Sequence, residues 1–171
     1  KNGNSAALCR AFAQGAEKSG HQVETIFLRD KKIGYCLACY HCKRAAAFVS
    51  SRMICRYSRQ NECSRRACHG QPRLFLFHRR ADEGAHRRTV AQWLTIKNKE
   101  FYYIMTAAEE SDTVMDCTLE CFRGLARCLE GSIERGVIYG KGVYGPGEIE
   151  SNLPCRKPIT WAARYNGKEK T

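Results

Sequence analysis

Apolar residues recur at helical spacing near the start of the chain. The pattern predicts a helix from Ser5 to Gly20, with Gly20 marking its end. Asn4 or Ser5 can cap this helix, because short polar side chains accept hydrogen bonds from the first free backbone N–H groups. The positions that share its inner face are Ala7, Leu8, Phe12 and Ala16.

Other segments have the pattern of strands. Gln22 to Leu28 partly alternates and is rich in β-formers, so it predicts a strand. Phe101 to Thr106 is a continuous apolar run, as expected of a strand buried on both faces. Gly136 to Tyr139 is a short strand, followed by a glycine-rich loop at 140–147.

A second helix is predicted from Ser111 to Glu130, with Ser111 or Asp112 as its cap. The predicted core positions are Val114, Met115, Phe122, Leu125, Ala126 and Leu129, and the cysteines at 117, 121 and 128 are also assigned to core positions. Since strand, helix and strand alternate, the fold class is α/β with a parallel sheet.

The charge is unevenly distributed. The chain of 171 residues has the length of one domain and a net charge of +12. Residues 44–88 hold eleven arginines and no lysine, against three acidic residues. One interpretation is a basic arm that binds RNA or DNA, with Tyr57, Phe75 and Phe77 stacking on bases. Because the charge is so local, a nucleic-acid partner is not the favoured interpretation. Within this segment only Leu74 to Phe77 resembles a strand.

The location of the protein is predicted from what the sequence lacks. No run of 18 apolar residues suggests a membrane span, and no secretion leader is visible. Eleven cysteines in a chain without such a leader indicate a reducing compartment, so we expect a cytoplasmic protein. The first residue is Lys1 rather than Met, which leaves open that residues precede it.

Two clusters have the composition of binding sites. Lys1, Asn2, Asn4 and Ser5 surround a permissive glycine just before a helix, where backbone N–H groups and the helix dipole attract anions. An ordinary capped helix with a loose terminus would explain the same residues.

The second cluster is Cys36-x-x-Cys39-x-x-Cys42, whose spacing lets successive thiolates converge on one metal or iron–sulfur cluster. With His41 the three cysteines could instead bind zinc. Loop cysteines without a ligand remain the third interpretation.

Four segments carry a family resemblance: KNGNSAAL, VETIFLRDKKIGYCLACYHCK, IKNKEFYYIMTAAEE, and GVIYGKGVYGPGEI, which follows a helix with Phe122-Arg123-Gly124. In order and spacing, residues 1–43 and 89–150 resemble the NADPH-dependent FMN reductase group of flavodoxin-like NAD(P)H-dependent flavin oxidoreductases. The resemblance implies a flavodoxin-like three-layer sandwich. Its first strand would precede Lys1 and be missing from this chain. Residues 1–150 would form the flavin-binding domain, and 151–171 an atypical tail.

The resemblance also implies a function. FMN would accept electrons from NAD(P)H and pass them to a small-molecule or protein acceptor, in a protein that is often a homodimer. Lys1, Asn2, Asn4 and Ser5 would bind the FMN phosphate. Thr106, Ala107 and Ala108 would lie near the flavin ring. Related iron–sulfur flavoproteins imply a [4Fe-4S] cluster at Cys36, Cys39 and Cys42, and hence an electron-transfer protein as the alternative. An alternative of another class is a basic, cysteine-rich module that binds metal or nucleic acid.

Residues 44–88 and 151–171 depart from the family pattern, and the genetic code offers an explanation. Codons permitted for Arg80 to Arg87, read one base later, encode Gly-Gln-Met-Lys-Ala-His-Ile, which is a family motif. In the family that motif is helical. A shifted reading of 68–76 permits a buried strand followed by the flavin loop, and one of 154–162 permits a string that resembles the family's last helix. We therefore predict frame disruption in both segments. A chain altered in this way could also be inactive.

Overall fold

The computed structural model describes residues 3–30, 37–40, 66–72, 84–87, 89, 93–111 and 113–151. Its elements, in chain order, are α1 (Asn4–Lys18), η1 (Leu28–Asp30), β1 (Arg66–Pro72), β2 (Glu100–Thr106), η3 (Thr113–Met115), α5 (Asp116–Arg127), β3 (Ile133–Gly140) and α6 (Glu148–Ser151). None of these helices combines the length and the apolar character needed to cross a bilayer.

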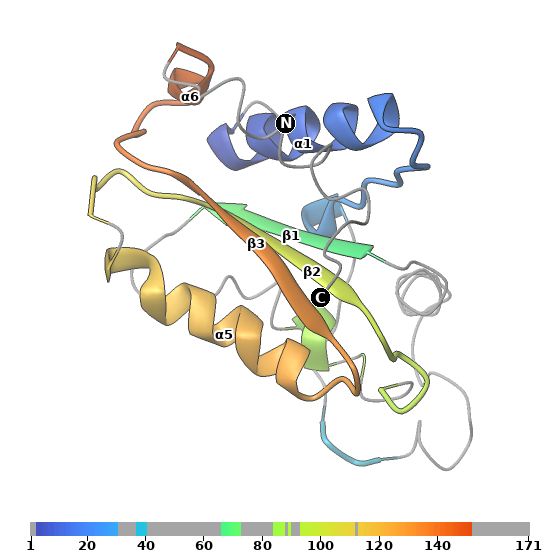
Figure 1. Cartoon of the computed structure of the whole chain (residues 1–171). Coiled ribbons are helices and arrows are strands. Elements are labelled where there is room, and N and C mark those ends of the chain that lie inside the picture. Colours follow the sequence, from blue (N-terminus) through green and yellow to red (C-terminus); the bar gives the residue numbers. More distant parts are fainter. Residues whose placement is uncertain are drawn as a thin grey trace, which may run out of the picture.

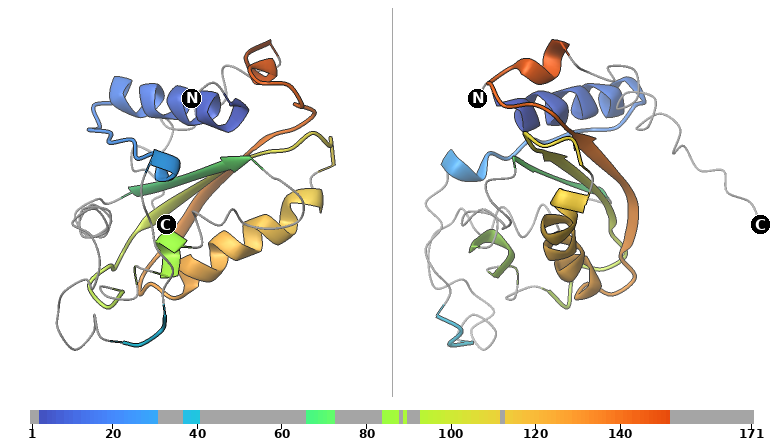
Figure 2. Two further views of the ribbon diagram at one scale, coloured as in Figure 1. Left: turned by 180° about the vertical axis from the view of Figure 1, so that it is seen from behind. Right: turned by 90° about the vertical axis from the view of Figure 1, so that its left-hand side faces the viewer.

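The strands form one parallel sheet between two layers of helix. Strand β2 lies in the middle and pairs with β1 on one side and β3 on the other. Helix α1 covers one face of the sheet and α5 covers the other (Figures 1 and 2). The predicted α/β class with a parallel sheet is confirmed. The described residues contain no strand ahead of β1.

The continuous apolar run at 101–106 forms a fully buried strand, as predicted. Every residue of β2 is buried, because β2 is flanked by strands on both sides and by helices on both faces. Its first residue, Glu100, keeps a partner: its carboxylate lies 3.1 Å from the Arg135 guanidinium on β3. Strand β3 begins three residues earlier than the predicted Gly136.

Side chains of alternate β2 residues fill two separate cores. On the α5 side, Tyr103 stacks on Phe122 with ring centroids 5.4 Å apart, and Met105 and Leu119 complete the contact. Burial raises the pKa of Tyr103 to about 12, so its ring is neutral in the folded protein.

On the α1 side, Tyr102 packs against Phe12 with centroids 5.1 Å apart. Leu8 and Ile104 are almost fully buried in the same cluster, together with Ile149 of α6. The predicted inner face of the first helix is therefore confirmed, with Ala16 packed at its margin.

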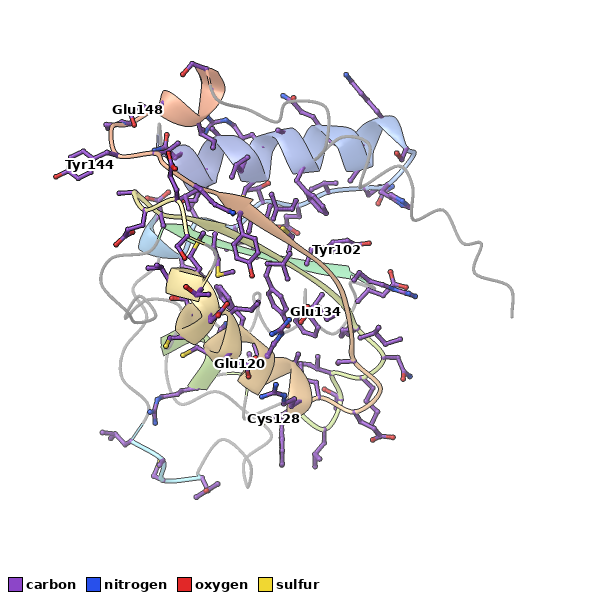
Figure 3. All side chains as sticks on the ribbon, turned by 60° about the vertical axis from the view of Figure 1, so that its left-hand side comes forward. Tyr102, Glu120, Cys128, Glu134, Tyr144 and Glu148 are labelled. Atoms are coloured by element: carbon purple, nitrogen blue, oxygen red, sulfur yellow. The ribbon has the colours of Figure 1, made fainter. Side chains whose placement is uncertain are left out.

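An ion network connects α5 to β3. The Arg123 guanidinium donates two hydrogen bonds to the Glu134 carboxylate on β3, at 2.7 and 2.8 Å, and one to Glu120. Glu120 also accepts a hydrogen bond from Arg127. These bonds hold the pKa of Glu120 below its usual range. Figure 3 shows Glu120 and Glu134 in the region between α5 and β3. The Phe122-Arg123-Gly124 motif thus has a structural role through Arg123.

Three local predictions were wrong. Residues 22–27 form no strand; a strand needs a hydrogen-bonded neighbour, and within the described residues β1 pairs with β2 alone. The second helix starts as the 3₁₀ turn η3, so α5 begins only at Asp116. Neither α1 nor α5 has the predicted side-chain cap: Gly3 and Met115 occupy the cap positions. The predicted strand at 74–77 lies outside the described residues.

Candidate functional site

The candidate site lies where the strands end. In a parallel sheet the carboxyl ends of all strands meet at one edge, and open α/β sheets bind ligands outside that edge. The loops 107–111 and 141–147 leave β2 and β3 there. The first turn of α1 lies at the same edge, beside α6 (Figure 1).

Backbone hydrogen bonds join these two loops beyond the last strand residues. The Ala107 N–H donates to the Gly140 carbonyl at 2.9 Å, and the Val143 N–H donates to the Ala107 carbonyl at 3.1 Å. The Gly142 N–H donates to the Glu109 carbonyl at 3.3 Å. The loops therefore form one continuous rim rather than two independent turns.

Asn4 connects this rim to α1. Its side-chain amide donates to the Gly145 carbonyl at 2.9 Å. Its Oδ1 accepts hydrogen bonds from the N–H groups of Gly147 at 2.9 Å and Ile149 at 3.3 Å. Asn4 therefore does not cap its own helix as predicted, because its oxygen serves the start of α6, more than 140 residues away in the sequence.

The N-terminus of α1 keeps the properties of an anion site. The first N–H group that bonds back along the chain is that of Ala7, to the Gly3 carbonyl at 3.1 Å. The N–H groups of Asn4, Ser5 and Ala6 precede it and have no partner within the helix. No side chain caps this end, and no acidic residue lies in its first turn. A helix end of this kind favours a bound anion.

The other predicted site residues divide into three groups. Lys1 and Asn2 lie outside the described residues. Ser5, Thr106 and Ala107 are buried. Ala108 is exposed on the loop after β2.

The sequence patterns did not single out Tyr144, which is the most exposed large hydrophobic side chain on the rim. Its side chain is 90% exposed, while its backbone N–H donates to the Glu148 carboxylate at 2.6 Å. Figure 3 shows the ring projecting away from the protein next to α6. The glycine-rich loop around it was the available signal.

Two of the cysteines form a contact that the sequence did not indicate. The thiols of Cys9 on α1 and Cys68 on β1 share a hydrogen bond. This bond lowers the pKa of Cys9 and raises that of Cys68 well above its usual range.

The cysteine triplet cannot be assembled from the described residues. Cys39 is exposed, between Ala38 and Tyr40, which both have positive φ. Cys36, Cys42 and the alternative zinc ligand His41 lie outside the described residues. The metal site stays a prediction, and the described residues alone hold no group of three potential metal ligands.

Gly140, the last residue of β3, is required by close packing. A Cβ at this position would lie 2.9 Å from Leu8 Cδ1 and Thr106 Cγ2, and 3.0 Å from Ile149 Cδ1. All three neighbours are buried, so they cannot move aside freely. The rim and α1 can approach each other because residue 140 has no side chain.

We expect Gly140→Ala to lower the free energy of unfolding by about 1–3 kcal/mol through overpacking. Gly124→Ala is the matched control, since a Cβ there meets no atom within 4 Å. In the interior of α5 the control should raise stability by about 0.5–1 kcal/mol. Urea unfolding measures both variants, and an equally stable Gly140→Ala protein would contradict the packing argument.

Comparisons with known proteins identify the fold. No protein-family model and no curated protein matches the sequence. Solved structures do match. An azoreductase of Bacillus anthracis is 10% identical, with TM-score 0.71, and the match covers 95% of this chain and 92% of the other.

Two further matches cover nearly the whole chain. An NAD(P)H:quinone oxidoreductase of Methanothermobacter marburgensis is 10% identical, with TM-score 0.68 and coverage of 100% and 93%. An FMN-dependent NADH-azoreductase of Bacillus anthracis, solved with FMN, is 12% identical, with TM-score 0.65 and coverage of 95% and 91%. The flavodoxin-like α/β fold predicted from the sequence is confirmed.

Proposed function

We propose that this chain is an FMN-dependent oxidoreductase that takes electrons from NAD(P)H and reduces a small acceptor such as a quinone or an azo compound. One observation carries the proposal: an uncapped helix N-terminus lies at the carboxyl edge of a parallel sheet. In the same fold, FMN-dependent azoreductase and quinone oxidoreductase activities occur in the matching proteins.

The residues present fit FMN. The N–H groups of Asn4, Ser5 and Ala6 would hold the phosphate, because they are donors at the positive end of the α1 dipole. Ala108, exposed on the rim directly after buried Ala107, would offer a small side chain to a flat ring. When bound, FMN would supply the hydride and electron chemistry. The protein would anchor and orient the flavin and limit access to it.

The surface of the rim and the matching proteins both favour a small acceptor. The rim is open to solvent at Ala108 and Tyr144, which suits an acceptor that enters and leaves. Quinone and azo substrates are named for the matching proteins. The iron–sulfur alternative and the nucleic-acid alternative have no such support, and a homodimer stays a prediction.

The phosphate anchor is testable by comparing FMN with riboflavin, which lacks the phosphate. We expect FMN to bind about 10- to 100-fold more tightly, because charge-assisted hydrogen bonds contribute about 1.5–3 kcal/mol. Flavin fluorescence quenching measures both affinities, and NADH or NADPH oxidation with menadione or an azo dye measures turnover. Equal affinity for the two flavins would contradict the anchor.

One variant separates this binding role from helix stability. Ala6→Asp places a carboxylate in the first turn of α1, where it should stabilise the helix by about 0.3–1 kcal/mol. The same carboxylate should repel the phosphate and reduce the FMN preference. Gln14→Asp, on the exposed side of the same helix, is the control with an unchanged preference.

A further inference from the structure

Contrary to the prediction, the two cysteines of α5 and the one at its C-cap are not core residues. Cys117, Cys121 and Cys128 are all exposed. The inner face of the helix is occupied instead by Thr118, Leu119 and Phe122, which are nearly inaccessible. Cysteine packs well as a small apolar residue, so its position in the pattern could not distinguish the two faces.

Cys117 and Cys121 lie one helical turn apart on the same face. Residues four apart on a helix have Cβ atoms about 5–6 Å from each other. Two ligands at this spacing can bind one centre, as the paired histidines of helical zinc motifs do. Cys128 lies about 10 Å further along the helix axis than Cys121, too far to join the same centre. It marks the far end of α5 in Figure 3.

The helix that carries the pair is anchored to the sheet. The side of α5 next to the pair is anchored by buried Phe122 and by the bidentate Arg123–Glu134 contact. Gly124, one turn beyond Cys121, lies within the same angular stripe of the helix. An added Cβ at Gly124 would meet no atom within 4 Å, so the helix surface at this position is uncrowded.

We propose that Cys117 and Cys121 form a two-thiol site for trivalent organoarsenicals. The described residues offer no third His, Cys, Asp or Glu ligand in a common group. This favours a centre that takes two thiolates from the protein and keeps its own substituent. The reacting species is the dihydroxy form R–As(OH)₂, which an arsine oxide gives by adding water. Two As–O bonds break and two As–S bonds form, and each thiol proton leaves with one hydroxyl as a water molecule. No oxidant or reductant is consumed.

Phenylarsine oxide is the probe. The folded protein is treated with one equivalent, remaining thiols are alkylated with iodoacetamide, and trypsin is added. Cleavage after Lys99 and Arg123 releases residues 100–123, which contain these two cysteines and no other. We expect this peptide to carry one phenylarsenic group in place of two thiol hydrogens and no alkylation. Two alkylated cysteines at saturating probe would overturn the proposal.

Single variants provide the controls. Cys117→Ser and Cys121→Ser should each abolish the bridged peptide, whereas Cys128→Ser should leave it unchanged. Because all three side chains are exposed, circular dichroism should show the same fold for each variant. Loss of bridging in Cys128→Ser, or bridging that survives Cys117→Ser, would contradict the assigned pair. Arsenic bound at other cysteines appears in different peptides and is scored separately.

Discussion

Replacing Phe122 by alanine is expected to lower the free energy of unfolding by about 3–5 kcal/mol. The Phe122 ring is 2% exposed and stacks on Tyr103 of the central strand. The His86 ring also contacts it edge-on, with centroids 6.2 Å apart. Removing the ring therefore forfeits apolar burial and an aromatic pair and leaves a cavity between α5 and the sheet.

Urea unfolding followed by circular dichroism measures this loss. Tyr144→Ala is the matched control, because it removes an aromatic ring that is 90% exposed. The control should change stability by less than about 0.5 kcal/mol. Similar values for the two variants would show that α5 does not form the second core with β2.

The core was predictable because its signals are local. The inner face of α1 and the buried run of β2 follow from helical and strand periods over adjacent residues. The strand expected at 22–28 failed because strand formation depends on a neighbour as well as on the residues themselves. Cysteine fits either a buried or an exposed helix face, so the residue type alone could not predict that Cys117 and Cys121 are exposed.

The candidate site was predictable in part. Helix position and the downstream segments predicted an anion site at the start of α1 and flavin contacts after β2, and both stay predictions. The Asn4 contacts could not be predicted, because they join residues more than 140 positions apart. Tyr144 was missed for a related reason: exposure within a glycine-rich loop depends on how that loop packs.

The frame-disruption hypothesis stays a prediction, but it acquires a structural context. Strand β1 spans Arg66–Pro72, in the region where the shifted reading permits a buried family-like strand. Residues 84–87 are helical where the shifted reading permits a family helix. The coding DNA together with the mass of the peptides from 44–88 decides the matter. An uninterrupted frame that encodes these residues would exclude the hypothesis.

Asn4→Ala is expected to have the second largest effect, because one side chain serves three backbone groups. Its removal leaves the Gly145 carbonyl and the N–H groups of Gly147 and Ile149 without their shared partner. Because these backbone groups are partly buried, leaving them without hydrogen bonds should lower the free energy of unfolding by about 2 kcal/mol. FMN affinity should also fall, by about tenfold, since the rim would no longer be held against the first turn of α1.

Asn4→Asp separates the two effects. A carboxylate still accepts the hydrogen bonds of Gly147 and Ile149 but can no longer donate to Gly145. Stability should therefore fall by less than in the alanine variant, by about 1 kcal/mol. FMN affinity should fall at least as far, because a negative charge now lies beside the phosphate, while riboflavin affinity should change little. If Asn4→Asp instead bound both flavins like the unmodified protein, Asn4 would be a purely structural residue and the anion site would have to lie elsewhere.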